Sequence, residues 1–152
     1  MSEKWSELCL EPGRSVLLSA VDSKGFPACC RGVAVDSGDG FATLTAYVPV
    51  ATSRDVIANI ASTRRLAVSI TKIIDHNSVQ VKGTATNVRL AREDEKDLLE
   101  TRFLAFADAL AEVGLPRRVT RAITHWPAFA VEMKVEQVFE QTPGPKAGNP
   151  MP

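Results

Sequence analysis

The sequence predicts a mainly β, α+β domain in which six antiparallel strands form a small barrel flanked by helices. Three observations predict this fold. Apolar and polar residues alternate with a period of two in several short runs, turns too short for a crossover helix join neighbouring runs, and a helical period appears in only a few places. Six such strands leave edges that must be closed or covered, which favours a barrel.

Length and composition fit one domain with an ordinary core. The 152 residues are 45% hydrophobic and 24% charged, a balance typical of a globular protein that buries much of its surface. We expect the domain to occupy residues 1–140. The Pro/Gly-rich stretch over residues 141–152 is expected to form an irregular tail.

The first three strands are predicted at 16–21, 27–35 and 41–48 as a meander. Gly25 allows the first turn, and the cluster from Asp36 to Gly40 forms the second. In the third run, aromatic and β-branched residues at 41, 43, 45 and 47 alternate with Ala42, Leu44, Ala46 and Val48, as expected of a strand between two different environments.

A short helix is predicted next, because Thr52 or Ser53 can cap it and Val56, Ile57 and Ile60 give it an apolar face. Two further strands follow at 66–71 and 79–86, joined by the turn at 75–77. In the second of them Val79, Val81 and Ala85 share one face, so the opposite polar face is expected to border solvent or a groove.

A long helix is predicted from Arg92 to Val113, where apolar residues recur at steps of three and four. Acidic residues in its first turns favour the positive end of the helix dipole, and Gly114 ends the helix. A second short helix is expected from Pro116. The sixth strand is predicted at 129–136.

Charge and patterning exclude several classes of function. Eighteen Lys and Arg balance eighteen Asp and Glu, so binding to nucleic acid is not expected. No apolar run resembles a signal peptide or membrane span, so we expect a cytoplasmic protein that does not bind membranes. Cys9, Cys29 and Cys30 are odd in number, fit a reducing compartment and are interpreted as small core residues.

The common nucleotide, zinc-protease and serine-hydrolase motifs are absent. No metal site is expected, because the adjacent Cys29 and Cys30 face opposite sides of a strand and His76 and His125 are isolated. His125 is interpreted as a partly buried, hydrogen-bonded histidine rather than a ligand-binding one. The phenylalanines at 103 and 106 are interpreted as core residues rather than as a surface that stacks on a cofactor.

The strongest candidate site is Thr52-Ser53-Arg54 at the start of the first predicted helix. Helix amides, a hydroxyl and a guanidinium meet there and could bind a phosphate. The alternative is an ordinary helix cap beside a solvated arginine. Arg31, in the middle of a strand, requires a partner or ligand if it is buried, and otherwise lies on the outer wall of the barrel.

A second basic cluster, formed by Arg117, Arg118 and Arg121, follows Pro116. Positions 117 and 121 fall on one face of a helix. The cluster is interpreted as a solvated face or as a partner for the acidic first turns of the preceding helix. Contact with an anionic cofactor is the alternative.

Over residues 14–140 the sequence resembles the pyridoxamine 5'-phosphate oxidase-like proteins, whose fold is a flavin-binding split barrel. The resemblance rests on the order of the elements, on Pro27-Ala28-Cys29-Cys30-Arg31-Gly32-Val33 and on Ser53-Arg54 opening the helix after the third strand. Two later segments also contribute: residues 59–68 and Val79-Gln80-Val81-Lys82-Gly83-Thr84-Ala85.

The resemblance implies FMN at the interface of a homodimer and an oxidoreductase that acts on a small molecule. It implies that Arg31, Ser53 and Arg54 hold the phosphate and that Gly32 and Val33 lie along the ring. Val48 and Ser78 complete the candidate cofactor-binding residues. No catalytic side chain is implied.

The sequence also departs from the family pattern. Asp55 follows Arg54 where the family often has lysine, and Ser78 stands near a position that the family fills with glutamine. No Arg-Ser-x-Gln string is present, so vitamin B6 oxidation is not expected. The alternatives are a non-catalytic flavin- or haem-binding protein that serves as sensor, carrier or interaction module, a deazaflavin in place of FMN, and a structural dimer without cofactor.

Overall fold

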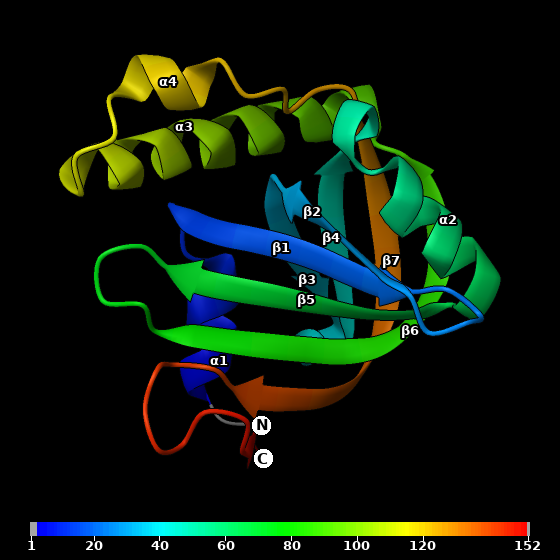
Figure 1. Cartoon of the computed structure of the whole chain (residues 1–152). Helices are drawn as coiled ribbons and strands as arrows, with labels where there is room; N and C mark the ends of the chain where they lie inside the picture. Colours follow the sequence, from blue (N-terminus) through cyan, green and yellow to red (C-terminus); the bar gives the residue numbers. More distant parts are fainter. Residues whose placement is uncertain (1–2, 152) are drawn as a thin grey trace.

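The structure, a computed structural model, describes residues 3–151. Met1 and Ser2, at the start of the predicted domain, and Pro152, at the end of the predicted tail, lie outside these residues. Figure 1 shows a curled antiparallel sheet with helices packed around it, which confirms the predicted split-barrel fold class. The strand order is β2-β1-β5-β6-β7-β4-β3, and β8 pairs with β7.

All six predicted strands are present, the second of them in two pieces. The strands are β1 (Arg14–Val21), β2 (Pro27–Gly32), β3 (Ala34–Gly38), β4 (Thr43–Pro49), β5 (Arg65–Lys72), β6 (Ser78–Leu90), β7 (Ala128–Glu140) and β8 (Pro150–Met151). The α-helices are α1 (Glu3–Leu10), α2 (Arg54–Thr63), α3 (Lys96–Glu112) and α4 (Arg117–Arg121). Three 3-10 turns are also present: η1 (Asp39–Phe41), η2 (Val50–Thr52) and η3 (Glu93–Glu95).

The predicted meander of the first three strands is wrong at Val33. There the chain leaves the neighbourhood of β1, which pairs with β2, and joins β4, which pairs with β3. The Val33 amide donates to the Tyr47 carbonyl at 2.8 Å. A Cβ on Gly32 would lie 2.6 Å from a Val16 methyl, so only glycine fits where the strand crosses between the two sheet edges.

No helix is predicted before residue 16, but α1 occupies residues 3–10. Trp5 and Cys9, one turn apart, are buried in the barrel core, and the Trp5 ring meets Phe41 edge to face at a centroid distance of 4.8 Å. The tail is not wholly irregular either, since β8 pairs with Val138 and Phe139 of β7. The two chain segments lie near each other at one end of the barrel (Figure 1).

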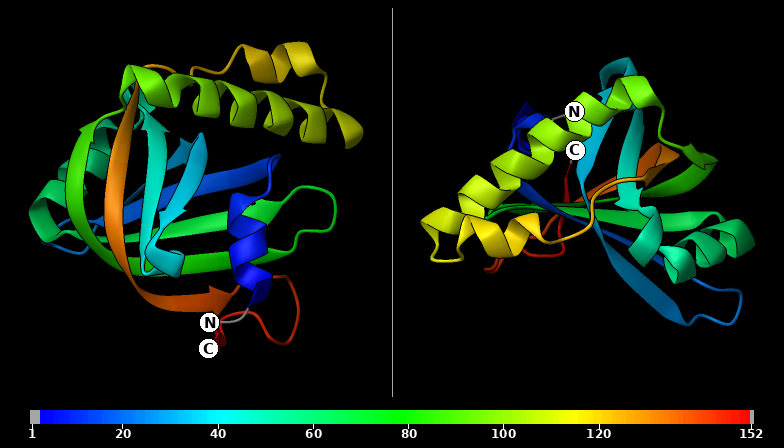
Figure 2. Two further views of the ribbon diagram at one scale, coloured as in Figure 1. Left: turned by 180° about the vertical axis from the view of Figure 1, so that it is seen from behind. Right: turned by 90° about the horizontal axis from the view of Figure 1, so that it is seen from above.

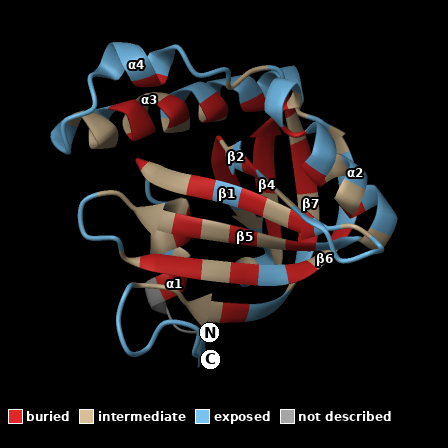
Figure 3. Cartoon of the chain, in the orientation of Figure 1, coloured by how far each residue is buried: buried red, intermediate tan, exposed pale blue. Residues whose placement is uncertain are grey.

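The long predicted helix is confirmed as η3 followed by α3, which crosses one end of the sheet with α4 beside it (Figure 2). Its buried residues Leu99, Phe103 and Phe106 face inward, as predicted, but Val113, the last residue of the predicted apolar face, follows the helix and is 54% exposed. Figure 3 shows this division, with buried residues along the inner side of α3 and a mostly exposed α4, in which Thr120 is buried.

The short predicted helix is confirmed as α2, which packs against the β1–β2 hairpin. The Asn59 amide donates to the carbonyls of Ala20 and Phe26 at 3.1 and 3.3 Å, and the Thr63 hydroxyl donates to Val21 at 2.9 Å. These bonds fix the second half of α2 against the end of β1 and the turn that leads into β2. Over residues 3–151, no helix combines the length and apolar character that crossing a membrane requires.

Candidate functional site

A cavity of about 290 Å³ lies between β2 and the helices that cross the barrel end. Residues 29–33 of β2 form one wall, and Pro49 and Thr52 close the end at which α2 begins. The opposite wall comes from Phe103 and Phe106 of α3 and from residues 123–125, which follow α4. The cavity is therefore mostly apolar and carries a few polar groups, as ligand sites do.

Arg31 is exposed on β2, where it lines the cavity, and it forms no ion pair among residues 3–151. Its Nη1 donates to the Ser15 hydroxyl at 3.1 Å, and its guanidinium lies 5.3 Å from the centre of the Phe106 ring. This cation–π contact orients the guanidinium without neutralising its charge. Arg31 thus keeps a full positive charge available to an anion in the cavity.

The start of α2 offers a second group of donors next to the same cavity. Ser53 stands at the N-cap position with its hydroxyl fully buried and without a hydrogen-bond partner among residues 3–151. Arg54, the first residue of α2, is exposed and forms no ion pair among these residues. The predicted capping bond from Ser53 is not formed, which leaves the first-turn amides of the helix without a side-chain partner.

The predicted cofactor-binding residues fall into two groups. Arg31, Gly32 and Val33 line the cavity, together with Thr52, the residue that precedes Ser53 and Arg54. Val48 is fully buried in the barrel core. Ser78 lies in a separate cavity bordered by residues of α1 and the C-terminal segment, where its hydroxyl contacts the Thr71 hydroxyl at 2.9 Å and donates to the His76 carbonyl at 2.7 Å.

His125 lines the cavity, although the sequence did not indicate a ligand-binding role for it. Its ring stacks on Phe103 with centroids 4.0 Å apart and an interplanar angle of 11°. Its Nε2 lies 2.6 Å from Oε2 of Glu100, so the interpretation as a partly buried, hydrogen-bonded histidine holds. Phe103 and Phe106 are buried, as predicted, but they also line the cavity.

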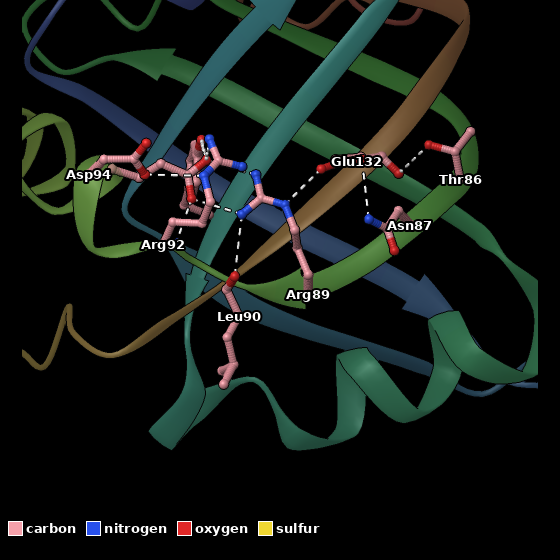
Figure 4. A network of polar contacts seen from close by, with 9 residues as sticks. Thr86, Asn87, Arg89, Leu90, Arg92, Asp94 and Glu132 are labelled. Atoms are coloured by element: carbon pink, nitrogen blue, oxygen red, sulfur yellow. Dashed lines mark hydrogen bonds and ion pairs between the residues drawn. The ribbon is translucent and has the colours of Figure 1, made fainter.

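A polar network centred on Arg89 joins η3 to β6 and β7 (Figure 4). Both Arg89 terminal nitrogens donate to the Glu95 carboxylate, at 2.7 and 2.8 Å, and Arg89 Nε donates to Glu132 at 2.8 Å. The Glu95 carboxylate also accepts from the Tyr47 hydroxyl at 2.9 Å and from the Arg92 amide at 2.7 Å. Because the Val33 amide bonds to the Tyr47 carbonyl, the network supports the β4 segment against which the cavity wall rests.

The network fixes the protonation of its members. The bonds from Arg89 lower the pKa of Glu95 to about 2, against a smaller opposing effect of burial. Burial and the bond to Glu95 raise the pKa of Tyr47, and the same carboxylate raises the pKa of Arg89. Glu95 is therefore ionised and Tyr47 neutral near neutral pH, which suits a structural role.

Two of the three cysteines, Cys9 and Cys30, are poor nucleophiles. Burial raises the pKa of the Cys9 thiol to about 12, and burial with the neighbouring Cys29 raises that of Cys30 to about 11. Cys29 is exposed, so the interpretation of all three as core residues is wrong for this one. It lies on the outward face of β2, as the alternation with Cys30 requires.

The second basic cluster does not meet the acidic first turns of α3. Arg117 pairs instead with Asp108, in the second half of that helix, which raises the pKa of the guanidinium. Arg118 and Arg121 form no ion pair among residues 3–151, as a solvated face predicts. In this same range, no three His, Cys, Asp or Glu side chains are grouped so that they could hold a metal ion.

Solved structures share this arrangement of elements. A candidate pyridoxamine 5'-phosphate oxidase from Lactobacillus delbrueckii matches 91% of this chain and 93% of its own, with a TM-score of 0.57 and 19% identity. HupZ of Group A Streptococcus matches 97% of this chain and 99% of its own, with a TM-score of 0.56 and 16% identity. An F420 reductase matches 87% of this chain and 94% of its own, with a TM-score of 0.50 and 14% identity.

These matches establish the fold. The chain has the split-barrel fold of the pyridoxamine 5'-phosphate oxidase-like proteins, which confirms at the level of structure the resemblance that the sequence indicates. No protein-family model and no curated protein matches the sequence.

Proposed function

We propose that this protein binds FMN and acts as an oxidoreductase on a small molecule, as a homodimer in the cytoplasm. The observation that carries the proposal is the pair of unneutralised donor groups beside one cavity. Arg31 lies on β2, and the partnerless Ser53 hydroxyl stands with Arg54 at the start of α2. A phosphate would satisfy both groups at once.

The residues fit the two ends of FMN. A buried hydroxyl without a partner costs folding free energy, about 1–3 kcal/mol, which a bound phosphate oxygen would offset. The largely apolar cavity, with Phe106 and Phe103 on one wall, suits a planar ring system. Asp55, in the first turn of α2, opposes phosphate binding by its charge.

FMN would supply the electron or hydride transfer when bound. The chain's own contribution is binding and orientation. Arg31 and Arg54 balance the phosphate charge, and the strand from Gly32 to Val33 borders the ring site. α3 and residues 123–125 limit the access of water to it.

Titration of FMN into the purified chain, followed by the quenching of flavin fluorescence, tests the proposal. Replacement of Arg54 by alanine is expected to weaken FMN binding roughly 10- to 100-fold, because it removes one charge-assisted bond. Arg118→Ala is the matched control, since Arg118 is another arginine without an ion pair in a short helix. No quenching in the wild type, or equal affinity in both variants, would contradict the proposal.

A carrier without catalysis is the alternative, and the same cavity supports it. Steady-state oxidation of NADH or NADPH by the flavin-loaded protein separates the two functions, because a carrier does not turn over. An absorption spectrum of the freshly purified protein separates FMN from a deazaflavin or haem. The similarity of the fold to an F420 reductase makes the deazaflavin the first alternative to examine.

A further inference from the structure

We propose that His125, oriented by Glu100, exchanges a proton with a planar O–H or N–H acid bound in the cavity. The proposal concerns the helix side of the cavity and does not depend on FMN. Its basis is an imidazole that lines the cavity, stacks flat on Phe103 and is held at one nitrogen by a carboxylate.

Glu100 sets the tautomer of the ring. A carboxylate accepts hydrogen bonds, so His125 Nε2, 2.6 Å from Glu100 Oε2, carries the hydrogen of this bond. In the neutral ring the other nitrogen, Nδ1, then holds a free lone pair. Nδ1 has no hydrogen-bond partner among residues 3–151, and stacking on Phe103 limits rotation of the ring.

The same cavity can stabilise the anion that proton transfer leaves behind. Arg31 lies over Phe106 and His125 over Phe103, three residues apart on α3, so both groups border the same space. Thr52 and Thr124 add hydroxyl groups to the lining. The other titratable side chains of the cavity are Cys29 and Cys30 of β2, and Glu100 lies behind the imidazole.

The step is a simple proton transfer. The O–H or N–H bond of the ligand breaks, its proton forms a new bond to His125 Nδ1, and the electron pair stays on the ligand as an oxyanion or a nitrogen anion. The imidazolium then faces the Glu100 carboxylate, and the ligand anion faces the Arg31 guanidinium. The ligand class that follows is a phenol or a heteroaromatic N–H or O–H acid.

Binding of 4-nitrophenol to the full chain tests this proposal, because its phenol and phenolate forms absorb at different wavelengths. The titration is made at a pH where the free dye is mostly phenol. We expect the bound dye to show the phenolate band in the wild type. His125→Asn and Glu100→Gln should lower the bound phenolate fraction about tenfold.

His76→Asn is the matched control, since His76 lies in an exposed turn with a positive φ that asparagine tolerates. Glu100 is half exposed, so its variant keeps the test valid even if His125→Asn unfolds. Failure of the dye to bind, or an undiminished phenolate band in either cavity variant, would overturn the proposal. If the chain ionises the dye but does not bind FMN, this inference stands and the proposed function is contradicted.

Discussion

Two serines on this chain have opposite environments. The Ser53 hydroxyl is buried without a partner, whereas the Ser78 hydroxyl contacts both Thr71 and the His76 carbonyl. A hydroxyl that folding leaves unsatisfied is a sign of a group kept for binding rather than for stability.

Replacement of Ser53 by alanine should therefore stabilise the free protein, by about 1 kcal/mol, because the desolvation cost of the hydroxyl disappears. The melting temperature should rise by roughly 2–4 °C. Ser78→Ala should lower it by a similar amount, since it removes satisfied bonds. Thermal unfolding of the two variants without ligand checks the pair, and a lower melting temperature for Ser53→Ala would contradict the assignment.

At the scale of elements, the pairing of β6 with β7 depends on Gly83. The register shifts between Lys82 and Gly83, and a Cβ at Gly83 would lie 1.9 Å from the Lys134 carbonyl oxygen. Because that atom belongs to the backbone, the neighbouring strand would have to move.

Gly83→Ala should cost at least about 3 kcal/mol of the free energy of unfolding, measured by urea denaturation. Gly38→Ala is the control, because its Cβ would meet only the Thr43 hydroxyl at 3.1 Å and its φ is −110°. If the two variants have similar free energies of unfolding, the strands can adjust at the register shift beside Gly83, and their pairing does not depend on this glycine.

The network of Glu95 joins η3 to β4, β6 and β7. The folded-state pKa of Glu95, about 2, lies below its ordinary 4.5, so the unfolded chain binds the proton more tightly. Its contribution to stability is fully present above about pH 4.5 and is lost as the pH falls toward 2.

Glu95→Gln should lower the free energy of unfolding by about 3 kcal/mol at pH 7, because Arg89 loses its doubly bonded carboxylate. The loss should shrink as the pH falls from 4.5 toward 2. Urea unfolding at pH 7 and pH 3 measures both effects. If Glu95→Gln lowers the free energy of unfolding by the same amount at both pH values, Glu95 is not the group that titrates.

For the whole molecule, the strands could be predicted because apolar and polar residues alternate in each of them over a run long enough to show a period of two. The break at Val33 could not be predicted, because β2 and β3 form one continuous strand-like run in the sequence. They are separated only where the chain crosses between the two sheet edges at Gly32. α1 was missed because it is only eight residues long, and its burial depends on the contact of Trp5 and Cys9 with a barrel that the sequence alone does not show.

The candidate site was predictable where it is local in sequence. Arg31 lies in a strand motif and lines the cavity, whereas Ser53-Arg54 stand at a helix start, directly after the lining residue Thr52. The contact of His125 with Glu100 joins residues 25 positions apart on separate elements, so no local pattern could indicate it. Phe103 and Phe106 match the helical spacing of core residues, so the sequence did not indicate that they also line the cavity.

The proposed dimer makes a prediction at this scale. Two chains of 16.4 kDa should give a mass of about 33 kDa by light scattering after gel filtration. Leu17 and Val21, partly exposed on the outer side of β1, are apolar residues that a second copy could cover. A species of 16.4 kDa at all concentrations would exclude a cofactor site shared between two copies.

Calorimetric titration with FMN and, separately, with riboflavin tests the central claim most directly, because the two ligands differ only in the phosphate. If Arg31 and the start of α2 bind that phosphate, FMN should bind at least about 100-fold more tightly than riboflavin. Equal affinities for the two flavins, or binding of neither, would contradict the account.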